Sequence, residues 1–241
     1  MKIPGNALPF LNGEKFSNAF QLRFSRRKGK TPTRMDFITQ RVQNSRVIHM
    51  GCVDHLPLIP QKIERNQWLH KKMVESASRC LGVDIDAEGV RYVKDELGYR
   101  DVMVHDILND VVPENIRSER WDFIVLGELL EHIDDPVTFL KALKFRYAAY
   151  IDKIIISVPH ALRIDNFKFN LLGKEVINSD HRYWFTAYTL SKILVLSGYR
   201  NIQIDFCEGF KTPLERPFKR LFLSFFPQFS DTLVAVAEFG E

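Results

Sequence analysis

The stretch RCLGVDIDAEGVRYVKDELGYRDVMVHDI, residues 79–107, has the pattern of one strand–helix–strand unit. Residues 79–86 form a largely apolar run that predicts a strand, and residues 87–97 predict a helix. Gly98 predicts a turn, after which residues 101–107 predict a second strand. Strands that are apolar throughout are typical of parallel sheets covered on both faces, so this unit predicts an α/β fold.

The same alternation extends outward over most of the chain. Further strands are predicted at 47–50, 121–127, 153–159, 201–206 and 231–239, and further helices at 35–44, 68–78, 136–145 and 186–197. No crossover helix separates the last two strands, which indicates one antiparallel strand near a sheet edge. We therefore expect a seven-stranded, mostly parallel sheet with helices on both faces. The predicted organisation is an irregular arm over 1–33 and a single domain over 34–241, with insertions near 56–70, 161–183 and 210–229.

Composition excludes several classes of protein. Hydrophobic residues make up 45% and charged residues 27% of the 241 residues, a balance typical of a soluble globular protein. The three cysteines form no CxxC pair, so neither a disulfide framework nor a cysteine zinc site is predicted, and a cytoplasmic location is expected. No run approaches the ~20 apolar residues of a membrane span, so we expect no integral membrane segment.

Small and acidic residues follow the predicted strands. In open α/β sheets, ligands bind beyond the carboxyl ends of the strands. Asp84, after one strand, can accept from both vicinal hydroxyls of a ribose, and Asp106, after the next, from an adenine amino group. Gly51 allows the backbone to come close to a ligand. Together these residues predict an adenosine pocket.

These residues lie in a series of longer motifs. The motifs are GVDID (82–86), HDI (105–107), VLGELLEHIDDPVTFL (125–140), SVPH (157–160) and DHRYWFTAYTLSKILVLSGYRNI (180–202). In this series the chain resembles the class I S-adenosylmethionine (SAM)-dependent methyltransferases, which are Rossmann-like, and among them the small-molecule type with a GELLEH motif. The resemblance spans roughly residues 46–206.

The resemblance implies a set of cofactor-binding residues. They are His49, Gly51, Cys52, Asp84, Ile85, Asp106, Ile107, Gly127 and Glu128. In this assignment Asp84 binds the ribose and Asp106 the adenine amino group. Gly127 and Glu128 line the pocket near the methionine end, and SAM is the expected cofactor.

The first motif departs from the family pattern. In GCVDH (51–55), His49 precedes the motif at the position of the usual acid, while Val53 and His55 stand where later glycines are usual. SAM carries no pyrophosphate that needs a bed of backbone amides, so we interpret the loop as a working variant. The alternatives are an ordinary turn in a catalytically silent, methyltransferase-like binding protein, or a dinucleotide-dependent dehydrogenase, which the missing glycines disfavour.

The expected reaction needs little covalent chemistry from the protein. The sulfonium methyl group is already activated, so the protein mainly aligns the nucleophile and, for a hydroxyl, supplies a base. The candidates for this base are Glu131, His132 and His181. The alternative for each is a purely structural role. We expect methyl transfer to a hydroxyl or similar nucleophile of a small molecule, such as a sugar or glycan precursor. Nucleic acid is not an expected partner, and a homo-oligomeric state stays open.

A metal-dependent alternative rests on the sequence ExxEH. Glu128, Glu131 and His132 fall within one helical turn, and His181 can complete a site with two carboxylates and two histidines. This resembles the metal-dependent 2'-O-methyltransferases of small-RNA 3' ends, and such ligands suit Mg, Mn or Fe. ExxEH also occurs in metal-free methyltransferases of this class, so the first prediction contains no metal.

The late segment 210–229 combines phenylalanines with basic residues. An amphipathic helix here can cover the sheet, bind a partner subunit, or touch a membrane surface or an anionic substrate. Covering the sheet is the usual role, and it is the one expected.

Overall fold

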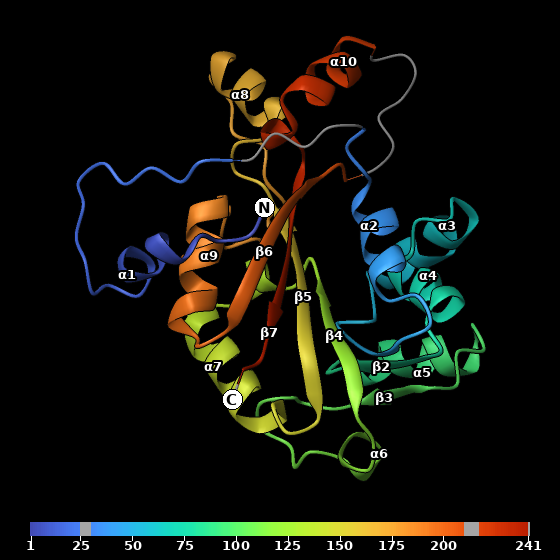
Figure 1. The fold of residues 1–241 in the computed structure, drawn as a ribbon. Helices are drawn as coiled ribbons and strands as arrows, with labels where there is room; N and C mark the ends of the chain where they lie inside the picture. The colour runs from blue at the N-terminus through green and yellow to red at the C-terminus, as the bar shows by residue number, and fades with distance from the viewer. Residues whose placement is uncertain (25–29, 210–216, 241) are drawn as a thin grey trace.

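The computed structural model describes residues 1–24, 30–209 and 217–240. Seven strands form one sheet, covered by helices on both faces (Figure 1). The strands are Arg46–Met50 (β1), Arg79–Asp84 (β2), Val102–Val104 (β3), Trp121–Gly127 (β4), Ile151–Pro159 (β5), Arg200–Cys207 (β6) and Thr232–Glu238 (β7). The helices are Leu8–Leu11 (α1), Arg34–Arg41 (α2), Ile59–Glu64 (α3), Leu69–Ser76 (α4), Ala87–Asp95 (α5), Glu114–Arg117 (α6), Pro136–Tyr147 (α7), Ile164–Leu171 (α8), Ala187–Leu196 (α9) and Pro217–Phe225 (α10). Short 3₁₀ turns span Gly5–Ala7 (η1), Leu56–Leu58 (η2), Leu130–His132 (η3) and Pro227–Phe229 (η4).

The strand order is β3-β2-β1-β4-β5-β7-β6, and β7 alone runs antiparallel to its neighbours within this described sheet. It lies between β5 and the edge strand β6, which confirms the predicted antiparallel strand near an edge. The chain order of the strands reverses between β1 and β4. Ligands of open α/β sheets bind at such a switch point, beyond the carboxyl ends of the strands.

Two helical layers bury opposite faces of the sheet. On β1, Ile48 packs in the cluster that contains Leu140 of α7 and residues of α9. The adjacent Val47 points the other way, into a cluster with Ile38 of α2 and Met73 of α4. Both faces of the central strands are therefore apolar, which is why those strands read as continuous hydrophobic runs.

The third strand is shorter than predicted. It ends at Val104, whereas the sequence pattern predicted a strand through residue 107. The reason is the side chain of Asp106, whose Oδ1 accepts hydrogen bonds from the backbone N–H groups of Leu108 and Asn109. Such an aspartate turn competes with strand pairing and ends it.

The first residues of the arm line the sheet edge. The Ile3 N–H donates to the Ile202 carbonyl at 3.0 Å, and the Ile204 N–H donates to the Met1 carbonyl at 2.8 Å. Backbone groups of β6 that would face solvent are paired in this way. Part of the basic run at 23–30 falls on residues 25–29, which lie outside the described residues.

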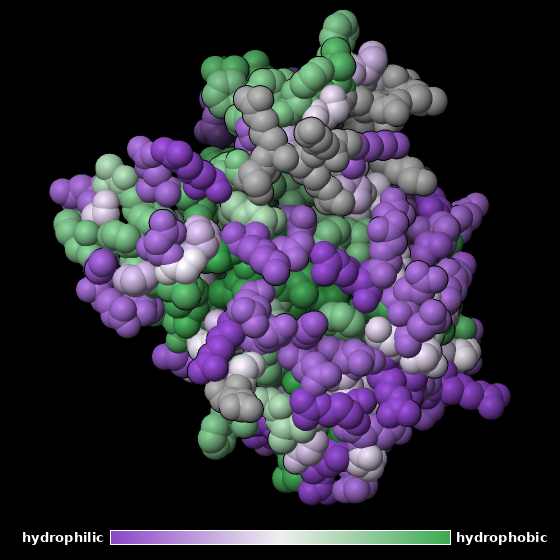
Figure 2. Space-filling view, viewed as in Figure 1, coloured by the Kyte–Doolittle hydropathy of each residue, from purple (hydrophilic) through white to green (hydrophobic). Residues whose placement is uncertain are grey.

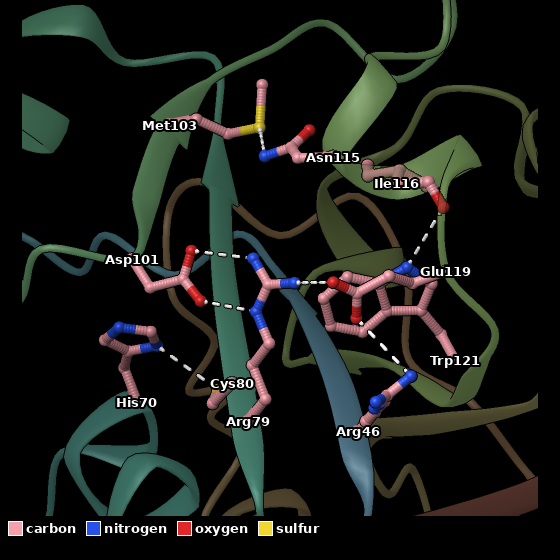
Figure 3. A network of polar contacts seen from close by, with 10 residues as sticks. All are labelled: Arg46, His70, Arg79, Cys80, Asp101, Met103, Asn115, Ile116, Glu119 and Trp121. Atoms are coloured by element: carbon pink, nitrogen blue, oxygen red, sulfur yellow. Dashed lines mark hydrogen bonds and ion pairs between the residues drawn. The ribbon is translucent and has the colours of Figure 1, made fainter.

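A network of charged side chains holds the amino ends of the strands (Figure 3). Arg79 makes two contacts with Asp101, at 2.8 and 3.3 Å, and a third with Glu119 at 2.7 Å. Its guanidinium also lies 4.9 Å from the ring centroid of Trp121, and Arg46 reaches the other Glu119 oxygen at 3.5 Å. These ends are opposite the carboxyl ends, so the network supports the sheet and leaves the ligand edge open.

The late insertion does not take its expected place. Residues 210–216 lie outside the described residues, and residues 217–229 form α10 and η4. Leu223 is fully buried, but Phe218 is 86% exposed. The expectation that this segment covers the sheet is therefore wrong for much of its apolar surface. Among the described residues, no helix is long and apolar enough to cross a membrane.

Candidate functional site

A cavity of about 730 Å³ opens at the carboxyl ends of β1, β2 and β4. Its size lies within the range of small-molecule pockets, and its position is the switch point of the sheet. The lining residues come from these strand ends, from α2, and from the insertions at 56–70 and 161–183.

Most of the predicted site residues lie on this cavity. Those that line it are His49, Gly51, Cys52, Asp84, Ile85, Gly127, Glu128, His132 and His181. Three predicted residues do not line it: Asp106, Ile107 and Glu131. Ile107 is buried in the hydrophobic core, and Asp106 is engaged in its own turn.

The glycine-poor loop after β1 is tied to β2. Gly51 has φ +71°, and a Cβ there would lie 3.3 Å from Leu129 Cδ1, so both conformation and space favour glycine. The N–H groups of Gly51 and Cys52 point to the Val83 carbonyl, at 2.9 and 3.3 Å. The Val53 N–H donates to Asp84 at 2.9 Å. These amides are engaged by β2 and are not arranged as a bed for a pyrophosphate.

Asp84 keeps acceptor capacity toward the cavity. Its two oxygens accept from the N–H groups of Val53 and Asp86, at 2.9 and 3.1 Å, and a carboxylate oxygen can accept more than one hydrogen bond. Burial is the main cause that raises the pKa of Asp84, while these backbone hydrogen bonds act in the opposite direction. The neighbouring Ile85 is 74% exposed at the cavity wall, where it can pack against a planar base.

Arg34 is a cavity residue that the sequence analysis missed. It is the first residue of α2, and its Nη1 lies 3.5 Å from Glu128 Oε1 and 3.2 Å from Ser157 Oγ. Glu128 has φ +57°, an uncommon value for a residue with a side chain and typical of functional positions. No sequence signal identified Arg34, because its place depends on how α2 packs beside β4 and β5.

Two buried histidines lie behind the first motif. The Nδ1 atoms of His49 and His70 are 3.2 Å apart, so one donates and the other accepts. Burial is the largest cause that lowers the pKa of His49, and it also lowers the pKa of His70 to about 4, so both rings are neutral near pH 7. His49 Nε2 lies 3.7 Å from where a Cβ of Gly127 would stand, at the cavity edge.

A cluster of one carboxyl group and two imidazoles lies beside the cavity. Glu131 is fully buried, and neither of its oxygens has a hydrogen-bond partner among the described residues. One ligand atom from each of Glu131, His132 and His181 lies within 4.8 Å of the others. His132 Nδ1 is 3.1 Å from the Asp180 carbonyl, which fixes that nitrogen as the donor and leaves Nε2 with a lone pair.

Burial controls the charge of this cluster. It raises the pKa of Glu131 strongly, and the nearby Glu128 acts in the same direction. Burial is also the first cause that lowers the pKa of His181, with His132 second. The cluster therefore favours a neutral imidazole, and its buried carboxyl group calls for a proton or a cation.

The insertion at 161–183 is fixed to η3, which carries Glu131 and His132. The Arg182 N–H donates to the Glu131 carbonyl at 2.8 Å, and the Tyr183 hydroxyl donates to the Asp134 carbonyl at 2.6 Å. The contact between His132 and Asp180, the residue before His181, spans 48 residues of chain. His181 thus reaches the cavity from a segment far along the chain from η3.

Comparison with known proteins agrees with this geometry. Residues 66–144 match the family of methyltransferase domains. The match covers about a third of the 241 residues and agrees with the resemblance to the class I methyltransferases. SAM is the cofactor of this class, as the sequence predicted. No curated protein sequence matches the chain.

Several solved structures share the fold. The methyltransferase domain of bacterial CtHen1-CN is 19% identical, with 86% of this chain and 97% of that chain covered and a TM-score of 0.50. A chain from the complex between the Haloferax volcanii Trm112 methyltransferase activator and a putative methyltransferase is 14% identical. The match covers 86% of this chain and 88% of that chain, with a TM-score of 0.52. Small RNA methyltransferase HEN1 is 14% identical, with 92% of this chain but 27% of that chain covered and a TM-score of 0.53. At these identities the similarity shows the fold.

Proposed function

We propose that this SAM-dependent methyltransferase transfers a methyl group to a hydroxyl or similar nucleophile of a small molecule, such as a sugar or glycan precursor. The observation that carries the proposal is one cavity that has Asp84 at one part of its wall and the imidazoles of His132 and His181 at another. A site for the adenosine of the cofactor and candidate bases for an acceptor therefore share one space of about 730 Å³.

The chain's own residues fit the cofactor. Asp84 would accept from the ribose hydroxyls, and Ile85 would pack against the base. Arg34 would attract the carboxylate of the methionine part, although it now contacts Glu128 and Ser157. The neutral His49 would offer Nε2 as donor or acceptor at the same end.

The proposed catalytic work is proton removal and alignment. The cofactor supplies a methyl group that is already activated on a sulfonium centre. His132 has Nδ1 held by the Asp180 carbonyl, so its Nε2 can accept the proton of an acceptor hydroxyl. The lowered pKa of His181 keeps its imidazole neutral, which suits it to the same task.

The test is a transfer assay with SAM that carries a labelled methyl group. The acceptor panel contains monosaccharides, nucleotide sugars and short RNAs, each assayed with and without a chelator. Labelled product from a sugar, with no loss on chelation, supports the proposal. Product from RNA alone would assign the enzyme to a different substrate class.

A metal-dependent RNA 2'-O-methyltransferase is the second candidate. The observation in its favour is the buried Glu131 carboxyl group, which has no hydrogen-bond partner in the described ranges and lies beside His132 and His181. Oxygen and imidazole ligands suit Mg, Mn or Fe, and the glutamate and both histidines would hold the ion. A bound ion would polarise an acceptor hydroxyl. Loss of transfer on chelation, with recovery on adding Mn or Mg, would favour this candidate.

A further inference from the structure

Apolar side chains gather on α8, on the residues that follow it, and on α10, which we call the α8–α10 face. Figure 2 shows hydrophobic colouring over these elements. Phe218 is 86% exposed, and Leu171 is 72% exposed. The exposed large apolar residues of the face are Leu162, Phe167, Leu171, Leu172, Val176, Ile177, Phe218, Leu221, Phe225 and Phe226. An apolar surface of this extent marks an interaction site.

The two helices are held together. Lys219 of α10 lies 2.9 Å from Asp165 of α8 and 3.1 Å from Asp231, and its side chain is only 13% exposed. Leu223 of α10 is fully buried. The exposed phenylalanines therefore project from an anchored helix, which lies at the same end of the molecule as α8 (Figure 1).

Two exposed lysines lie on this face, one of them next to the exposed Glu175. Lys168 and Lys174 are exposed, and neither forms an ion pair within residues 1–24, 30–209 and 217–240. Phenylalanine and leucine flanked by lysine and arginine are typical of amphipathic helices that lie in a bilayer interface and attract anionic headgroups.

We propose that the α8–α10 face docks on an anionic lipid bilayer. The helices would lie on the bilayer and bury Phe218, Leu221 and Phe225 among the headgroups, while Lys168 and Lys174 contact lipid phosphates. The same insertion continues from α8 to His181 on the cavity, so docking would bring membrane-associated acceptors close to the site. The proposal does not rest on the methyl acceptor, because docking needs neither cofactor nor turnover.

The experiment is co-sedimentation of the full chain with vesicles. Vesicles of phosphatidylglycerol and phosphatidylcholine are compared with vesicles of phosphatidylcholine alone, at low and high salt. We expect binding to the anionic vesicles that weakens at high salt, because the electrostatic attraction is screened. Replacing Phe218→Ser together with Phe225→Ser should weaken binding by at least about tenfold, since both lose apolar burial.

A matched control is Phe145→Ser. Phe145 is 90% exposed on α7, away from the face, so this variant should bind vesicles as the wild type does. Circular dichroism of each variant checks the fold. Failure of the wild type to sediment with anionic vesicles would overturn the proposal. Binding of the Phe218/Phe225 double variant to anionic vesicles as strong as that of the wild type would also overturn it. The same holds if the wild type self-associates and the double variant loses this self-association but still binds vesicles.

Discussion

The Val53 N–H donates to the Asp84 carboxylate at 2.9 Å, and this bond joins the glycine-poor loop after β1 to the proposed ribose acceptor at the end of β2. The Gly51 N–H reaches β2 as well, through the Val83 carbonyl. The loop is thus built around the acid that would hold the cofactor. A single glycine at the tightest point is enough for this arrangement.

Replacing Asp84 with alanine should weaken binding of S-adenosylhomocysteine by roughly 1.5–3 kcal/mol, the range for hydrogen bonds to a charged group. Asp106→Ala should weaken it less, because Asp106 lies off the cavity and its oxygens accept from its own turn. Isothermal titration calorimetry of both variants shows which substitution weakens S-adenosylhomocysteine binding more. Equal affinity of Asp84→Ala and the wild type would remove Asp84 from the ribose site.

Gly51→Ala should destabilise the protein by about 1–2 kcal/mol, because φ is +71° and the left-handed region is costly for alanine. Gly98→Ala is the matched control, with φ +77° and no atom within 4 Å of the added Cβ. Both should lower the midpoint of chemical denaturation. Gly51→Ala alone should also weaken S-adenosylhomocysteine binding, since its Cβ presses on Leu129 at the cavity. If Gly51→Ala bound S-adenosylhomocysteine as tightly as the wild type, the loop would not be part of the cofactor site.

His181→Ala should lower the turnover number by about a hundredfold, the lower end of the range for loss of a general base. Affinity for S-adenosylhomocysteine should change little, because His181 lies with Glu131 and His132 in the proposed catalytic cluster. Asn178→Ala, also on the cavity wall, is the control for a purely local change. Steady-state kinetics with any acceptor found by screening gives the answer. A change in KM with unchanged kcat would assign His181 to acceptor binding.

The buried histidines predict acid sensitivity. The folded protein holds the pKa of His70 at about 4, below its ordinary 6.5, because of burial. On acidification the imidazole of the unfolded chain therefore takes up a proton first, and the contribution of His70 to the free energy of unfolding falls by roughly 3 kcal/mol as pH drops from about 6.5 to 4. Urea denaturation across this window measures the fall. His70→Gln should reduce it, and a fall in this variant equal to the fall in the wild type would contradict the burial of a neutral imidazole.

Much of the fold was predictable because periodicity reports directly on burial. The strand WDFIVLG has the predicted bounds, Trp121–Gly127, since both of its faces are covered. The third strand was overextended because an apolar pattern does not show that Asp106 will bind its own backbone and form a turn.

The site was predictable only where residues follow strands directly. Asp84, Glu128 and Gly51 stand at strand ends, so local sequence placed them near the cavity. Arg34 reaches the cavity only through helix packing. His70 meets His49 across 21 residues of chain, a contact that depends on how α4 packs on the sheet.

Calorimetric titration with S-adenosylhomocysteine, repeated after chelator treatment, tests most directly whether the loop at Gly51 serves a cofactor site. We predict binding near the micromolar range, about −8 kcal/mol. Absence of binding in both conditions would contradict the account and favour a catalytically silent, methyltransferase-like binding protein.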